Sequence, residues 1–148
     1  MIFAPRDLAV WLCDGLVAAG HEVFFFTAPD VRTRATIIPG DVRLMEETIR
    51  EEKPADVGSE RMKWASFYTR KRNYEMDLTQ RAYAMARDGK LDIIHSYHDT
   101  LAHFFDELTG FPTVYTLHDP LPKPGTLSHW LLSKFADHHY ISISDAFR

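Results

Sequence analysis

Short apolar runs alternate with helix-length segments along this chain, and this alternation limits the fold more than any other feature. Four runs have the length and the β-branched or aromatic content of strands, at residues 23–27, 92–96, 113–117 and 140–143. A shorter run lies within residues 34–39. Strands that alternate with helices join through right-handed crossovers into a parallel sheet. The sequence therefore predicts an α/β fold with helices on both faces of a parallel sheet.

The segments between the runs carry helical patterns and signals that end helices. Residues 7–19 place leucines at helical spacing, which predicts that these leucines face the core, and Gly20 follows where a left-handed residue ends a helix. Residues 61–88, residues 100–108 and the segment after Thr126 are the other predicted helices. The length of 148 residues suits a single domain.

Composition excludes several classes of protein. The formal net charge of -4 gives no overall attraction to nucleic acid, so no nucleic-acid partner is expected. The single cysteine, Cys13, cannot form an internal disulfide, which fits a reducing compartment. No stretch approaches the roughly 18 apolar residues that a membrane span needs. Arg6, Asp7 and Asp14 also interrupt any leader-like segment. We therefore expect a cytoplasmic protein.

Polar side chains gather where the predicted strands end. In open parallel sheets, ligands bind beyond the carboxyl ends of the strands. The residues that these ends deliver are Thr27, Asp30, His95, Ser96, Tyr97, His98, Asp99, Thr116, His118, Asp119, Ser142, Ser144 and Asp145. Their clustering indicates a polar binding site. The alternative, that such residues only cap helices and end strands, stays open for each of them.

The histidines and aspartates of this set also suggest a metal site. Neutral imidazoles and carboxylates are competent zinc ligands. The candidate ligands are His95, His98, Asp99, His118 and Asp119. However, residues three apart at a strand end generally diverge, and the spacing matches no recognised metal motif. We therefore predict no metal ion.

Four segments that occur in a fixed order carry a resemblance to a known family. They are residues 16–23 (LVAAGHEV), 91–96 (LDIIHS), 113–120 (TVYTLHDP) and 141–146 (ISISDA). Together they resemble the N-terminal domain of retaining glycosyltransferases with the GT-B fold, the group 1 or family 4 class. The resemblance covers nearly the whole chain. It implies a Rossmann-like parallel sheet with helices on both faces, in one of two domains that face each other across a cleft.

The resemblance also implies that residues 1–148 form a single partial domain. The family's first strand is missing, and residues 2–6 contain no glycine where the family places a loop near the donor phosphates. The donor-binding C-terminal domain is missing as well. Because the family's first strand lies between the runs 23–27 and 92–96, an open slot is expected there. Unpaired strand edges recruit partners, so we expect self-association.

The function implied by the resemblance is acceptor binding in a glycosyltransferase. In the family, a sugar passes from a nucleotide-sugar donor to an acceptor with retention of anomeric configuration, and no metal or other cofactor takes part. The implied partners are a sugar or lipid-linked acceptor and a nucleotide-sugar held by the C-terminal domain. The chain alone is expected to be inactive. The alternative is a non-catalytic binding subunit that pairs with a separate donor-binding chain.

His118 is the predicted catalytic residue. In the family, a histidine after the corresponding strand lies beside the transferred sugar and contacts its hydroxyl groups. An imidazole can donate or accept a hydrogen bond near neutral pH, so it can orient a hydroxyl group. The alternative is a strand-end histidine bonded to a backbone carbonyl. The predicted substrate-binding residues are His95, Ser96, His98, Asp119 and Ser144.

Residues 61–72 combine five basic residues with Trp64, Phe67 and Tyr68. Some members of the family dock on membranes through such helices to reach lipid acceptors, and basic, aromatic segments bind anionic lipid surfaces. This suggests peripheral contact with the inner face of a membrane. We favour the alternative, a solvated helix whose aromatic residues pack on the core.

Overall fold

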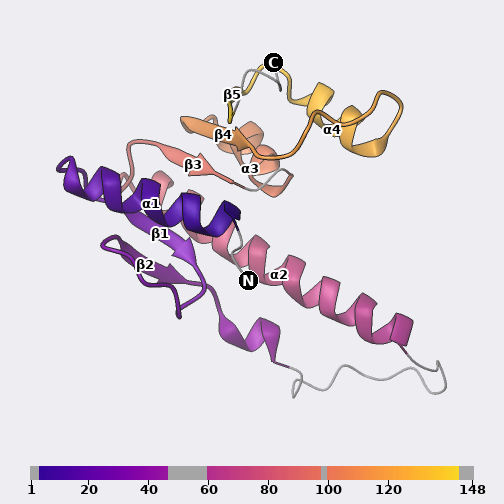
Figure 1. Ribbon diagram of the computed structural model, residues 1–148, viewed down its shortest axis with the longest axis horizontal. Coiled ribbons are helices and arrows are strands. Elements are labelled where there is room, and N and C mark those ends of the chain that lie inside the picture. The colour runs from indigo at the N-terminus through magenta and orange to yellow at the C-terminus, as the bar shows by residue number, and fades with distance from the viewer. Residues whose placement is uncertain (1–3, 47–59, 98–99, 144–148) are drawn as a thin grey trace.

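The computed structural model describes residues 4–46, 60–97 and 100–143. Helices and strands alternate along the chain, which confirms the predicted α/β class (Figure 1). The elements are α1 (Ala4–Ala18), β1 (Phe24–Thr27), β2 (Thr36–Pro39), the 3-10 helix η1 (Val42–Met45), α2 (Glu60–Arg87), β3 (Ile94–Ser96), α3 (Leu101–Thr109), β4 (Thr113–Leu117), α4 (Leu127–Lys134) and β5 (His139–Ser142).

The strands form two separate parallel sheets. β1 pairs with β2 along its whole length, and we call this pair the N-terminal half-sheet. β4 lies between β3 and β5, and these strands form the C-terminal half-sheet. In the described part of the chain no strand joins β1 to β3. The predicted parallel pairing is therefore confirmed, and the break falls where the slot is expected.

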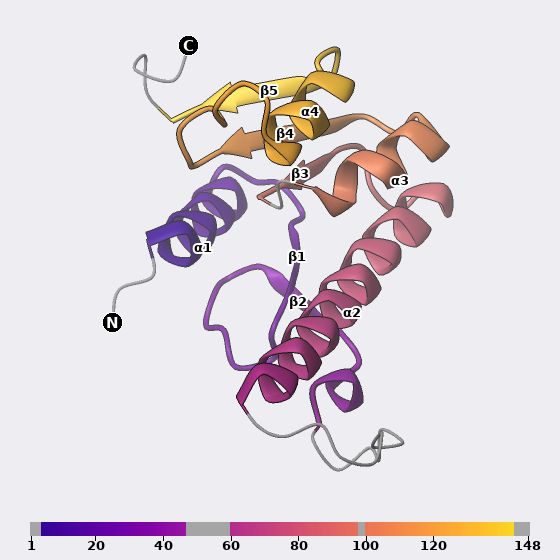
Figure 2. The same cartoon turned by 90° about the vertical axis from the view of Figure 1, so that its right-hand side faces the viewer.

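Helices lie on both sides of β1. Figure 2 shows this strand running between α1 and α2. The side chain of Asp14 in α1 accepts hydrogen bonds of 2.6 Å from the Thr33 hydroxyl and from the Arg34 backbone N–H, just before β2. On the other side, the Tyr74 hydroxyl of α2 donates to the Thr27 carbonyl at the end of β1. Side-chain hydrogen bonds thus tie both helices to the N-terminal half-sheet.

The largest buried side chains lie in the C-terminal half of the fold. Tyr115 of β4 and Phe135 at the end of α4 are each 2% exposed. Tyr83 of α2 is also buried, and its hydroxyl oxygen lies 3.1 Å from the Ala102 carbonyl and 3.0 Å from the Thr113 hydroxyl. These contacts join α2, α3 and β4 around one aromatic core.

The prediction that the leucines of α1 face the core is wrong. Leu8 and Leu16 are exposed, whereas Ala9 and Cys13 are buried. The buried face of α1 therefore carries small side chains, and Leu8 and Leu16 lie off that face. Burial is the main cause that raises the pKa of the Cys13 thiol, which suits a structural thiol better than a nucleophile.

Candidate functional site

Three aromatic rings form a stack at the carboxyl ends of β3 and β4. His95 lies in β3, Tyr97 follows that strand and His118 follows β4. The ring centroids of His95 and Tyr97 are 4.7 Å apart, and those of Tyr97 and His118 are 4.8 Å apart. The parallel pairing of β3 with β4 brings both strand ends to one edge. The two histidines therefore flank one tyrosine in a single site.

The nitrogens of the two histidines differ in their hydrogen bonding. The Nε2 atom of His95 lies 2.6 Å from the Thr116 hydroxyl oxygen, which links β3 to β4. The Nε2 atom of His118 is buried and has no hydrogen-bond partner among the described residues. A buried polar atom without a partner costs about 1–3 kcal/mol. A ligand hydroxyl group that reached His118 would remove this cost.

The surroundings of the stack shift the pKa values of His95 and Tyr97. Desolvation is the main cause that lowers the pKa of His95, and the nearby His118 acts in the same direction. Burial also raises the pKa of the Tyr97 hydroxyl. A neutral imidazole offers one donor and one acceptor nitrogen, which matches the hydroxyl groups of a sugar.

The structure brings some of the predicted site residues together. Ser96 is partly buried at the end of β3, next to His95, and Asp119 is exposed directly after His118. His98 and Ser144 lie outside the described residues. Tyr97 and Thr116 belong to the strand-end polar set but were not predicted to bind substrate. The signal for Tyr97 was its place in the sequence between the strand-end histidines His95 and His98.

The predicted absence of a metal ion stays a prediction. No group of three or more His, Cys, Asp or Glu side chains in residues 4–46, 60–97 and 100–143 could hold a metal ion. His98 and Asp99, two of the candidate ligands, lie outside these ranges.

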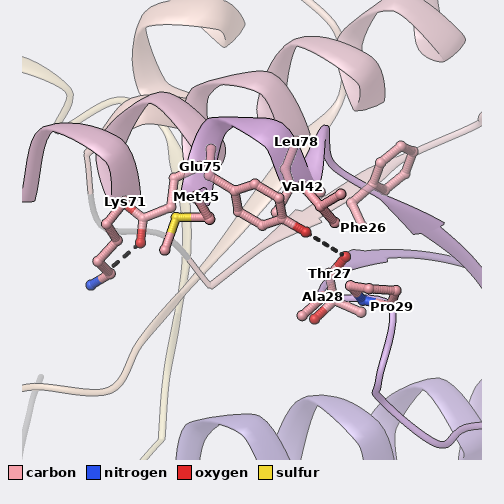
Figure 3. A pocket seen from close by; sticks show the side chains of 10 residues that line it. Phe26, Thr27, Ala28, Pro29, Val42, Met45, Lys71, Glu75 and Leu78 are labelled. Carbon is pink, nitrogen blue, oxygen red and sulfur yellow. Dashed lines mark hydrogen bonds and ion pairs between the residues drawn. The ribbon is translucent and has the colours of Figure 1, made fainter. Parts of the chain in front are cut away.

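A pocket lies at the carboxyl end of β1. Its volume is about 420 Å³, and it opens between β1, η1 and α2 (Figure 3). The lining residues are Phe26, Thr27, Ala28, Pro29, Val42, Met45, Lys71, Tyr74, Glu75 and Leu78. It is a second place where the carboxyl end of a parallel strand meets a concave surface, the usual location of ligands in such folds.

The mixed α/β fold with short parallel sheets is consistent with a Rossmann-like glycosyltransferase half-domain. A family model for Glycosyltransferase Family 4 matches residues 9–148. The chain therefore belongs to Glycosyltransferase Family 4, and it corresponds to the N-terminal domain of the group 1 enzymes. No curated protein matches the chain. The predicted family is confirmed, and membership supports a glycosyltransferase-type function.

Within residues 4–46, 60–97 and 100–143, no helix combines the length and the apolar character needed to cross a bilayer.

Proposed function

We propose that this chain is the acceptor-binding part of a retaining glycosyltransferase, in which a second domain holds a nucleotide-sugar donor. The observation that carries the proposal is the stack of His95, Tyr97 and His118, with the unpaired Nε2 atom of His118. Membership of Glycosyltransferase Family 4 supports the reaction class. In this proposal the chain alone transfers no sugar, because the second domain binds the donor's leaving group.

In the proposed reaction, this chain orients hydroxyl groups. His118 contacts a hydroxyl group of the transferred sugar, while the rings of Tyr97 and His95 fix the position of the imidazole. Asp119, Ser96, His98 and Ser144 are proposed to bind substrate around it. Stabilisation of the pyrophosphate leaving group falls to the donor-binding domain. The proposal includes no metal ion and no cofactor beyond the nucleotide-sugar.

The test is a transfer assay on a protein that joins this chain to a donor-binding domain. His118→Ala should lower kcat and kcat/KM together, because the lost contact matters chiefly in the transition state. Positioned polar groups of this kind contribute about 10²–10³-fold. The matched control is His139→Ala, which removes an exposed histidine of β5. Normal turnover in folded His118→Ala protein would contradict the role and move it to Asp119 or His98.

The non-catalytic binding subunit remains the competing proposal. In the first proposal, transfer occurs when a donor-binding domain is on the same chain. In the competing proposal, transfer needs a separate donor-binding chain. Turnover of any nucleotide-sugar by the 148-residue chain alone would contradict both, because each assigns the donor to another unit.

Peripheral contact with the cytoplasmic face of a membrane is a further proposal. The favoured packing of the α2 aromatics on the core is wrong for Phe67 and Tyr68, which are 41% and 60% exposed. Lys71 and Arg72 lie on the same turns of α2 and are exposed. Exposed aromatic and basic side chains together favour anionic lipid surfaces. Phe67→Ser/Tyr68→Ser should reduce co-sedimentation with anionic vesicles, and unchanged binding would contradict the proposal.

Self-association is proposed from the separation of the half-sheets. Among the described strands, β1 pairs only with β2 and β3 pairs only with β4, so each has a second backbone edge without a strand partner. Such edges recruit strands from other chains. Sedimentation should show a concentration-dependent rise in mass, whereas a stable monomer at all concentrations would contradict it.

A further inference from the structure

The pocket beside β1 has walls from three elements. Phe26 and Pro29 come from β1 and the residues after it, Val42 and Met45 come from η1, and Leu78 comes from α2 (Figure 3). These side chains present hydrocarbon, an aromatic ring and a thioether. The volume of about 420 Å³ lies in the range of pockets that hold small ligands, roughly 300–1,000 Å³.

Two polar contacts lie beside the pocket. The Tyr74 hydroxyl lies 3.4 Å from the Thr27 carbonyl oxygen, to which it donates. At the rim, Lys71 Nζ lies 3.4 Å from Glu75 Oε1, one turn along α2. Figure 3 shows both contacts as dashed lines. With these groups paired, an apolar ligand can enter without leaving them unsatisfied, whereas a charged ligand would have to compete for them.

Close packing fixes the walls before any ligand binds. A Cβ atom on Gly40, which follows β2, would lie 2.7 Å from the Tyr74 ring, so that ring packs directly against the Gly40 backbone. The Asp77 side chain of α2 accepts a 2.8 Å hydrogen bond from the Asp41 backbone N–H at the start of η1, and it pairs with Arg81. A pocket that is already formed loses less conformational entropy on binding.

We propose that this pocket binds an unbranched alkyl chain of the acceptor, with the polar head of the acceptor at the rim. This inference rests on the proposed function, which it extends by naming a class of acceptor. Most of the lining is apolar, and its charged residues, Lys71 and Glu75, pair with each other at the rim, where they offer hydrogen-bonding groups to the head of the acceptor. A pocket bounded by three elements admits a slender chain more readily than a folded protein partner.

The test is a calorimetric titration of the chain with hexyl, heptyl and octyl β-glucosides below their micelle-forming concentrations. If the alkyl chain enters the pocket, each added methylene should lower Kd about four-fold, the factor that corresponds to about 0.8 kcal/mol per buried methylene. Methyl β-glucoside should bind far more weakly than the octyl compound. Affinity that does not change with chain length would overturn the proposal.

Two variants locate the bound chain. Val42→Asp places a charge at the pocket wall, and Met45→Trp fills the pocket, both at residues that are exposed enough to tolerate change. Each should weaken octyl glucoside binding at least ten-fold with an unchanged melting temperature. The matched controls Leu108→Asp and Leu108→Trp alter an 83% exposed leucine at the end of α3 and should bind as wild type does. Equal binding by Val42→Asp, Met45→Trp and the wild type would overturn the assignment.

The titration also separates this inference from the proposed function. His118→Ala should keep the chain-length dependence, since His118 does not line the pocket. Alkyl glucoside binding without transfer in the joined protein would contradict the function and leave the pocket assignment standing. Transfer to acceptors that Val42→Asp does not affect would contradict the pocket assignment and leave the function standing.

Discussion

The two half-sheets bury different kinds of side chain. In the C-terminal half, the aromatic residues Tyr115 and Phe135 are fully buried. In the N-terminal half, the buried residues around α1 and β2 are small, as with Ala9 and Ala35, and every residue of β1 is only partly buried. The difference follows from strand neighbours, since β4 has a partner on both sides and β1 has one.

The two half-sheets also carry different kinds of candidate binding site. The C-terminal half-sheet holds the ring stack at the ends of β3 and β4. The N-terminal half-sheet leaves room beside β1 for an apolar pocket. The polar ring stack thus belongs to the half with the aromatic core, and the apolar pocket belongs to the half whose strand β1 has one strand partner.

A contact between buried His103 and partly buried His138 adds to the order of the C-terminal half. His103 of α3 is 2% exposed, and its Nδ1 atom lies 2.9 Å from Nδ1 of His138. The other ring nitrogen of His138 lies 3.2 Å from Glu107, and its Nδ1 lies 3.5 Å from Asp106. His103 also stacks on Tyr115 at 3.9 Å between centroids. These contacts fasten the segment before β5 to α3.

The largest expected effect is a loss of stability in the C-terminal half. Phe135→Ala removes a fully buried ring and should lower the free energy of unfolding by about 3–5 kcal/mol. Phe25→Ala, in partly buried β1, should lower the free energy of unfolding clearly less, because less apolar surface of this ring is buried in the wild type. Urea denaturation measures both. Equal losses would break the contrast between the two half-sheets.

Removal of the histidine contact should have the next largest effect. His138→Ala deprives buried His103 Nδ1 of its 2.9 Å partner and should cost about 1–3 kcal/mol. His129→Ala, in α4, serves as a control and should be nearly neutral. A His138→Ala protein as stable as wild type in urea would show that the pair does not order this half.

A smaller effect is expected at the start of α4. The Thr126 hydroxyl oxygen accepts a 3.2 Å hydrogen bond from the His129 backbone N–H, as a helix N-cap does. Thr126→Ala should cost about 1 kcal/mol, and Thr126→Ser should restore most of it. If the serine variant melts no higher than the alanine variant, the cap does not stabilise this half.

The smallest predicted effect is a pH dependence that originates at His95. Because burial lowers its folded-state pKa, the unfolded chain binds the proton more readily. The contribution of His95 is therefore complete above the ordinary pKa of about 6.5 and is lost as the pH falls below it. His95→Gln should flatten the stability profile between about pH 6.5 and 5. Parallel profiles for the two proteins would refute this origin.

Local sequence signals predicted the elements well because each signal acts within a few residues. Thr113–Leu117 is a strand with the predicted bounds, and Thr126 caps the helix after it as predicted. Which side chains are buried was harder to predict, because burial depends on packing between segments that are distant in the sequence. Leu108 has the helical spacing of a core residue, yet it is 83% exposed. His103 is buried because Tyr115 and Phe135 stack on it from other elements.

The candidate site was predicted in part for the same reason. Parallel strands bring their carboxyl ends to one edge, so the meeting of His95 and His118 followed from the strand pattern. The stacking of Tyr97 between them depends on ring orientations that the pattern does not specify. The pocket beside β1 needed α2 and η1 to approach from distant parts of the chain.

The central claim is that a sugar binds at the ring stack of the C-terminal half-sheet. The direct measurement is NMR of the eight histidine side chains during titration with methyl glycosides, which carry a sugar but no long alkyl chain for the pocket beside β1. The account predicts saturable shifts of the His118 and His95 ring signals with one common Kd, and unchanged signals for buried His103 and its partner His138. An unchanged His118 signal with every glycoside, or equal shifts at all histidines, would contradict it.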